Sequence, residues 1–256
     1  MIGIFDSGSG GLTVLTAIRK EFPSTDIVYF ADLKYAPYGN RSREELTMRM
    51  VEALKILVGN GATCIVSACN SVSASLAISL FDALSIAPDR LIEMVGPTVA
   101  GMRGSSKRIL LVATQATIDS KIYQSAFSMI GKTIETLALP ELAGAIEHGV
   151  DENAIEDMIR KEFSHIDFTS FDAVVLACTH YPLVSPVFRK VLPEHIEIVD
   201  PADAVASRVL QDWWPREVGK GTQRFLLSAD SSIFRSRVVE LFPNTTSTIE
   251  VLEETI

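Results

Sequence analysis

The sequence predicts an α/β protein made of two similar doubly wound domains with mostly parallel sheets. Short apolar runs rich in β-branched residues alternate with amphipathic segments, which is typical of parallel sheets covered by helices. This pattern starts again near the middle of the chain, and the letters partly repeat, since residues 92–97 match residues 196–201. Because open α/β sheets bind ligands at the carboxyl ends of their strands, we expect the active site in the cleft between the domains.

In the first half of the chain, the pattern of apolar residues predicts four strands and two helices. The apolar runs that predict strands are residues 2–5, 27–30, 63–68 and 92–95. The spacing of apolar residues predicts helices over residues 12–22 and 43–57. Ser42 precedes the second helix as an N-cap, and Glu45 stands three residues later, which is the spacing of a capping box.

The second half repeats this order of elements. Apolar runs predict strands at residues 108–113, 173–177 and 196–199, and helical spacing predicts a helix over 120–130. We expect Pro97 and Pro201 to mark turns out of their strands.

The predicted domain division follows from this repeat. We place the first domain at residues 1–96 and the second at 97–206, with residues 207–256 returning to complete the first domain and 225–227 as one of its strands. Paired tryptophans at 213–214 are expected to pack rather than to bind a ligand. Residues 243–246 are expected to form a turn.

Composition and charge exclude several classes of protein. Of the 256 residues, 47% are hydrophobic and 21% charged, an ordinary balance for a folded globular protein. The net charge of −9 gives no basic footprint for nucleic acid, and no apolar run is long enough to cross a membrane. Since the N-terminus does not resemble a secretory signal, we expect a cytoplasmic protein with a small-molecule partner. The sequence leaves open whether the chain forms a homodimer.

Three cysteines carry the clearest chemical signal. Their odd number and wide spacing argue against a disulfide framework and a metal site. Cys64 begins an apolar run and is expected in the core. Cys69 and Cys178 each end such a run, beside Asn70-Ser71 and Thr179-His180. A cysteine in that place is often only a small core residue, but the duplicated context favours a two-sided acid/base device.

The glycine-rich segment 6–12 follows the first strand and opens the first helix. Its backbone N–H groups could bind an anion or could simply form a tight turn. It does not match a nucleotide-binding loop, since the glycine spacing differs and no lysine follows. Asp6 could cap the turn or tune a nearby thiol. Residues 37–39 indicate either a loop that lines a site or an ordinary turn.

Several motifs together resemble the glutamate racemases of the aspartate/glutamate racemase family. They are residues 5–8 with 10–12, 36–39, 68–70, 113–114 with 116–118, and 178–182, which occur in the family's order. Three departures are visible: Ser9 replaces a common valine, Ser71 stands where threonine is usual, and Ala177 where glycine usually precedes the second cysteine. We expect these to alter packing or kinetics rather than the reaction.

The resemblance implies interconversion of L- and D-glutamate without a cofactor, with Cys69 acting on the D-enantiomer and Cys178 on the L-enantiomer. Racemisation removes the α-proton from one face and delivers a proton to the other, which two facing thiols can do if one is a thiolate. A thiolate at neutral pH needs support from nearby groups. His180 could support Cys178, and Asp6 could support Cys69.

The expected substrate-binding residues are Asp6, Ser7, Pro37, Tyr38, Gly39, Asn70, Ser71, Thr114, Thr117, Thr179 and His180, of which Thr114 and Thr117 are the weaker candidates. No arginine or lysine lies within the motifs, which fits binding by backbone dipoles and hydroxyl groups. Asp32 and Glu147 match acidic positions implicated in the family, and Glu147 is a candidate catalytic residue, although either could be a solvated acid. The remaining histidines, at 148, 165 and 195, are expected at the surface.

The product, D-glutamate, would supply peptidoglycan synthesis. Two alternatives stay open at this point. One is a racemase for aspartate or another amino acid on the same scaffold. The other is a non-catalytic ligand-binding or regulatory relative, of the kind reported to affect DNA gyrase. The presence of both thiols together with Asp6 and His180 argues against lost catalysis.

Overall fold

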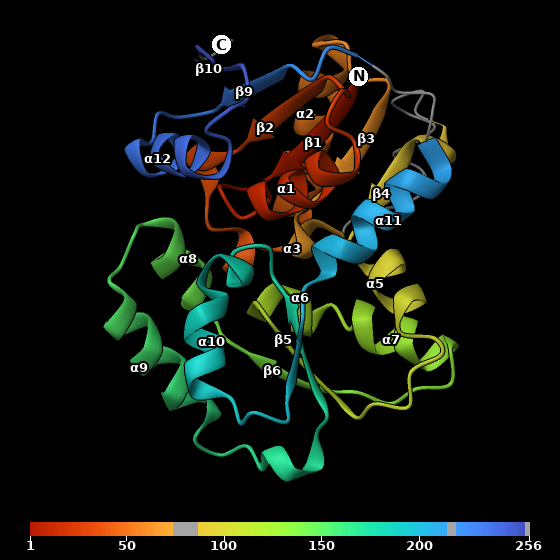
Figure 1. Ribbon diagram of the computed structural model, residues 1–256, viewed down its shortest axis with the longest axis vertical. Helices are drawn as coiled ribbons and strands as arrows, with labels where there is room; N and C mark the ends of the chain where they lie inside the picture. Colours follow the sequence, from red (N-terminus) through yellow and green to blue (C-terminus); the bar gives the residue numbers. More distant parts are fainter. Residues whose placement is uncertain (74–86, 214–218, 254–256) are drawn as a thin grey trace.

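The computed structural model describes residues 1–73, 87–213 and 219–253. Its strands form two separate sheets, and every strand pairing among these residues is parallel. Figure 1 shows the two sheets in two lobes, with both chain termini in the same lobe. The predicted fold class, two α/β units with parallel sheets, is confirmed.

The six-stranded sheet has the order β10-β9-β2-β1-β3-β4. Its strands are β1 (Ile2–Asp6), β2 (Ile27–Ala31), β3 (Cys64–Ser67), β4 (Leu91–Glu93), β9 (Gln223–Leu227) and β10 (Ser247–Val251). The central strands β1 and β2 are buried along their whole length. Helices cover both faces of the sheet, which explains why these strands appear in the sequence as continuous apolar runs.

The four-stranded sheet has the order β6-β5-β7-β8. Its strands are β5 (Ile109–Ala113), β6 (Glu135–Ala138), β7 (Ala173–Ala177) and β8 (Glu197–Val199). The two central strands, β5 and β7, are again fully buried, and they pair in register from Ile109 with Ala173 to Ala113 with Ala177. The residues at the carboxyl ends of these buried strands therefore lie at an edge of the sheet that is itself buried.

Helices cover the two faces of each sheet. In the six-stranded lobe they are α1 (Leu12–Glu21), α2 (Arg43–Gly59), α11 (Pro201–Trp213) and α12 (Ser232–Leu241). In the other lobe they are α5 (Val95–Gly101), α6 (Gln115–Asp119), α7 (Ile122–Met129), α8 (Leu142–Glu147), α9 (Glu152–Phe163) and α10 (Ser185–Val191). The capping box predicted for α2 is confirmed, since Ser42 and Glu45 exchange side-chain to backbone hydrogen bonds.

Short elements connect these helices and strands. They are the short helix α3 (Asn70–Ser73) and the 3₁₀ turns at Leu33–Tyr35, Tyr38–Asn40, Pro88–Arg90, Phe168–Ser170 and Tyr181–Val184. The predicted turn at residues 243–246 is confirmed. No helix in the described ranges is both long enough and apolar enough to cross a membrane.

The structure corrects the expectation for the two prolines that follow the repeated strands. Pro97 lies in the first turn of α5, and Pro201 is the first residue of α11, so both begin helices rather than turns. Proline is tolerated there because the first N–H groups of a helix have no intrahelical partner. The Glu93 carboxylate accepts hydrogen bonds from the N–H groups of Val95 and Gly96, which ends the strand at Glu93 instead of Val95.

The position of α11 bears on the domain division. Ala202, Val205 and Ala206 pack in the core of the six-stranded sheet, together with Trp213. We propose the same two domains as the sequence predicted, but with the return to the first lobe close to Pro201 rather than at residue 207. Trp213 is buried and its indole N–H donates to the carbonyl of Asp89, whereas Trp214 lies outside the described residues.

Candidate active site

The two cysteines predicted to be catalytic lie beyond the carboxyl ends of interior strands, one in each sheet. Cys69 follows β3 of one lobe and Cys178 directly follows β7 of the other, and both are buried. The Cys69 Sγ lies 3.9 Å from the Ser7 hydroxyl, and the Cys178 Sγ lies 3.9 Å from His180 Nδ1.

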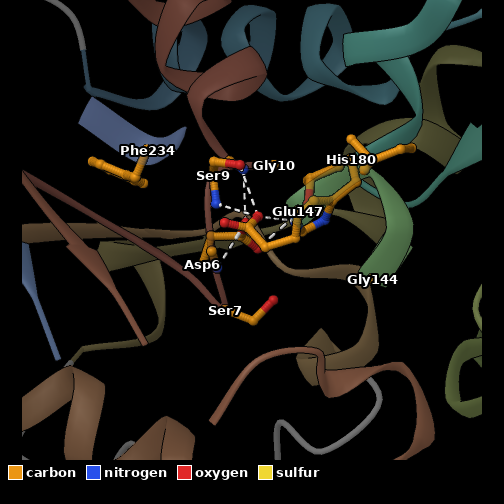
Figure 2. Close-up of polar contacts among 12 residues, drawn as sticks. Asp6, Ser7, Ser9, Gly10, Gly144, Glu147, His180 and Phe234 are labelled. Carbon is orange, nitrogen blue, oxygen red and sulfur yellow. Dashed lines mark hydrogen bonds and ion pairs between the residues drawn. The ribbon is translucent and has the colours of Figure 1, made fainter. Parts of the chain in front are cut away.

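Cys178 is linked through His180 to Glu147, the last residue of α8. His180 Nε2 lies 2.6 Å from Glu147 Oε2, and Figure 2 shows Glu147 between His180 and the turn that carries Ser9. Because a carboxylate can only accept, Nε2 carries a proton and Nδ1 faces the thiol. Nδ1 can therefore accept a proton from Cys178 or donate one to it.

Glu147 and His180 each stabilise the charged form of the other. Burial alone would raise the pKa of Glu147, but the hydrogen bond and charge of His180, with further hydrogen bonds from Ser9, hold it at about 2. Burial opposes charge on His180 as well, yet its contacts with Cys178 and Glu147 raise its pKa well above the usual value. An ionised Glu147–His180 pair thus stands beside the Cys178 sulfur.

Cys69 has a different environment. Burial raises its pKa, and the negative charge of Asp6 raises it further, with smaller opposing effects from the Val72 N–H and the Ser7 hydroxyl. Burial also raises the pKa of Asp6 itself, against the charge of His180. These effects favour the neutral thiol form of Cys69. Protonation of Asp6 would remove its negative charge and with it one of the two main causes of the raised pKa of Cys69.

The glycine-rich turn after β1 is occupied by protein carboxylates. Asp6 Oδ2 accepts hydrogen bonds from the N–H groups of Gly11 at 2.8 Å and Gly8 at 3.4 Å. Asp6 therefore caps this turn, which is one of the two roles expected from the sequence. The turn also touches the other lobe closely. A Cβ on Gly10 would lie 2.6 Å from His180 Nδ1, and one on Gly8 would lie 2.5 Å from Glu147 Oε2.

Hydroxyl groups from both lobes meet near Cys69. The Ser71 hydroxyl lies 2.9 Å from that of Thr114 and 3.5 Å from that of Thr117, so the structure brings these two weaker candidates to Ser71. Gly39 packs here too, since a Cβ on it would lie 2.9 Å from the Thr114 Cβ. Thr179 donates to Asp6 Oδ1 at 3.3 Å, also across the lobes.

Asn70 leaves one hydrogen-bond donor unused. Its Oδ1 accepts from the Tyr123 hydroxyl at 2.6 Å, which fixes the amide so that Nδ2 is turned the other way. Nδ2 is buried and has no hydrogen-bond partner among the described residues. An unpaired buried donor is costly, and a ligand oxygen would satisfy it.

The loop that carries Tyr38 lies on the Cys69 side of the site, since Tyr38 and Cys69 belong to one hydrophobic cluster. The Tyr38 ring packs against Phe5, and its hydroxyl donates to Asp32, so both Tyr38 and Asp32 are buried and paired with each other. Pro37 is half-buried and follows a cis peptide bond. The expectations for the other residues are confirmed: Cys64 lies in the core, and the histidines at 148, 165 and 195 are exposed.

Comparison with known proteins identifies the family of this chain. Residues 13–209 match the family model described as Asp/Glu/Hydantoin racemase. The chain belongs to this family. It is 34% identical over 259 residues to the glutamate racemase of Aquifex aeolicus (strain VF5), covering 98% of this chain and 99% of that one. Another relative, the glutamate racemase of Thermoanaerobacter sp. (strain X514), is 34% identical over 240 residues, which are 91% of this chain and 89% of that one.

Solved structures of the same family have the same architecture. Glutamate racemase isoform RacE1 from Bacillus anthracis superposes with a TM-score of 0.87 at 28% identity, covering 100% of this chain and 98% of that one. The glutamate racemase of Francisella tularensis in complex with D-glutamate gives a TM-score of 0.84 at 25% identity, covering 98% and 97%. The chain is accordingly an isomerase, an amino-acid racemase.

Three residues of this racemase site were not predicted from the sequence. Ser9 departs from the family pattern and has no predicted role, yet it donates to Glu147 through its N–H and its hydroxyl. Tyr123 orients Asn70, and Arg237 of α12 contacts Ser9. Tyr123 and Arg237 lie outside every motif, and no signal in the sequence placed them near the thiols.

Among the described residues, no group of three or more His, Cys, Asp or Glu side chains could hold a metal ion.

Proposed function

We propose that this racemase interconverts L- and D-glutamate without a cofactor, by proton transfers to and from Cys69 and Cys178. The observation that carries the proposal is the placement of two buried thiols, one from each lobe, at the carboxyl ends of β3 and β7. The relatives named glutamate racemase support glutamate as the substrate.

The reaction needs a base on one face of the α-carbon and an acid on the other. In the L-to-D direction, Cys178 as thiolate takes the α-proton, and the Cys69 thiol gives its proton to the opposite face. The bond from hydrogen to carbon breaks on one side and forms on the other, which leaves Cys178 as thiol and Cys69 as thiolate. The reverse direction exchanges the two roles. The assignment of each cysteine to one enantiomer rests on the resemblance.

His180 and Glu147 prepare Cys178 for this task. With Nε2 bound to Glu147, His180 Nδ1 takes the thiol proton and the resulting imidazolium stabilises the thiolate. The raised pKa of His180 favours that ion pair at neutral pH. Asp6 acts on Cys69 by electrostatics, because its charge opposes a thiolate there until Asp6 is protonated.

In this proposal the substrate is held by neutral hydrogen-bonding groups, because no arginine or lysine lies within the motifs. The free Asn70 Nδ2 donates to a substrate carboxylate, and the hydroxyl groups of Ser7, Ser71 and Thr179 lie around the thiols. A net charge of −9 would repel glutamate at long range, so such local dipoles are needed. Cytoplasmic production of D-glutamate for peptidoglycan completes the proposal.

Circular dichroism tests this function directly. Purified protein is incubated with L-glutamate, and separately with D-glutamate, without added cofactor, and aspartate is the comparison substrate. We expect the ellipticity of both glutamate samples to decay to zero, with little change for aspartate. Faster decay with aspartate would assign the enzyme to that substrate, and no decay with either amino acid would contradict racemisation of these two.

A further inference from the structure

Arg237 connects the two lobes next to the Glu147–His180 pair. It belongs to α12 of the six-stranded lobe, and its guanidinium donates to the Ser9 hydroxyl and to the carbonyl of Ile146, the residue before Glu147. Its Nη1 also lies 3.9 Å from Glu147 Oε2, and only 17% of the side chain is exposed. A largely buried arginine with these contacts is held by them in one position.

Through the Ser9 hydroxyl, the contact with Arg237 also fixes a hydrogen bond to Glu147. An arginine can only donate, so the Ser9 hydroxyl accepts from Arg237 and must direct its single hydrogen elsewhere. Glu147 Oε2 receives that hydrogen at 2.7 Å and the Ser9 backbone N–H at 2.9 Å. Arg237 therefore removes the rotational freedom of the hydroxyl and commits it to Glu147.

The donors around Glu147 all select the same oxygen. Oε2 contacts Ser9 twice and His180 once, with Arg237 close by, whereas Oε1 is buried with no hydrogen-bond partner among the described residues. The two oxygens of a carboxylate are chemically equivalent, so this unequal arrangement comes from the surroundings. The bond of Arg237 to the Ile146 carbonyl also fixes the backbone at the end of α8.

We propose that Arg237, acting through Ser9, is a positioning residue that holds Glu147 Oε2 against His180 and so aims His180 Nδ1 at Cys178. The proposal rests on the function proposed above. Arg237 does not contact either thiol, so its effect belongs to proton transfer at Cys178 rather than to substrate binding.

Nuclear magnetic resonance tests the positioning without any substrate. The Nε2–H proton shared by His180 and Glu147 should give a downfield resonance, identified by its loss in His180→Asn. We expect that resonance to persist in wild type and to broaden or vanish in Arg237→Met and in Ser9→Ala. Arg237→Lys should restore part of it. Arg235→Met is the matched control, since Arg235 lies on the same helix in a largely exposed ion pair with Asp230. An unchanged resonance in a folded Arg237→Met would overturn the proposal.

Kinetics with glutamate give a second readout. We expect Arg237→Met to lower kcat about 10- to 100-fold, the effect of losing hydrogen bonds to a charged group, while KM stays nearly constant. In a Glu147→Gln background the same substitution should cost little more, because both act on one step. Equal losses in both backgrounds would mean a merely structural role. If wild type does not racemise glutamate, the proposed function fails, and the resonance alone decides the positioning.

Discussion

The two thiols have unequal partners, although in the proposed mechanism they serve the same reaction in its two directions. Cys178 faces a histidine that can exchange a proton with it, whereas Cys69 faces a serine hydroxyl and the charge of an aspartate. The resting enzyme is thus expected to hold its negative charge on the Cys178 side. Sequence motifs alone predict a role for both thiols, His180 and Asp6, because each follows a recognisable apolar run.

Replacing either thiol should stop the reaction. We expect Cys69→Ala and Cys178→Ala each to abolish racemisation of L- and D-glutamate, because each removes one of the two proton carriers. The loss of one buried sulfur should cost only about 1 to 2 kcal/mol of stability, so both variants should stay folded. Far-ultraviolet circular dichroism checks the fold, and polarimetry checks turnover. Near-normal turnover in either variant would exclude the two-base mechanism.

Tyr123 should affect binding rather than proton transfer. Its hydroxyl holds Asn70 Oδ1, which directs the free Nδ2 to the proposed substrate position. We expect Tyr123→Phe to raise KM for both enantiomers about three- to tenfold, the typical effect of one hydrogen bond, with a smaller change in kcat. Tyr35→Phe, at a half-buried tyrosine outside the site, is the control. A change confined to kcat would show that Tyr123 does not position a binding group.

At the scale of elements, continuous apolar runs were predictable and polar edge strands were not. The buried central strands β1, β2, β5 and β7 were all expected within a residue or two of their observed bounds. Edge strands β6 and β10 were missed because their residues are half-buried or exposed and form no apolar run. Helix α12 was missed as well, and with it the contact between Arg237 and Ser9.

The turn between β1 and α1 depends on glycine because it lies against the other lobe. We expect Gly10→Ala to lower both the melting temperature and kcat, since its Cβ would lie 2.6 Å from His180 Nδ1 and 2.8 Å from the His180 backbone nitrogen. Gly59→Ala is the control, because a Cβ there meets nothing within 4 Å. Equal behaviour of the two variants in melting and turnover would show that the lobes do not approach here as described.

At the scale of the whole molecule, the sequence predicted two lobes with a site between them but not how the lobes interlock. Motif order indicates which residues share a sheet edge, whereas contacts such as Ser71 with Thr114 depend on the angle between the lobes. That angle is set by many packing contacts spread over the chain, including α11 against α5. No local pattern in the sequence encodes it.

The Glu147 contacts should make the stability of the folded chain depend on pH. The pKa of Glu147 is lowered from 4.5 to about 2, so its ionised form contributes stability that is complete above pH 4.5 and is lost as the pH falls toward 2. The size of this contribution at neutral pH is on the order of 3 kcal/mol. Urea unfolding of wild type and Glu147→Gln between pH 7 and pH 3 measures it. Their difference should shrink on acidification, and a constant difference would contradict the account.

The central claim, that separate thiols serve the two faces of the substrate, is tested most directly by isotope entry in heavy water. L-glutamate is converted in D₂O, and the α-position of product and of remaining substrate is followed by mass spectrometry from the first turnovers. The account predicts that D-glutamate carries solvent deuterium from the start while unreacted L-glutamate acquires little, because the acid that completes the reaction is not the base that began it. Early D-glutamate that retains the original proton would contradict it and would mean that one base serves both faces.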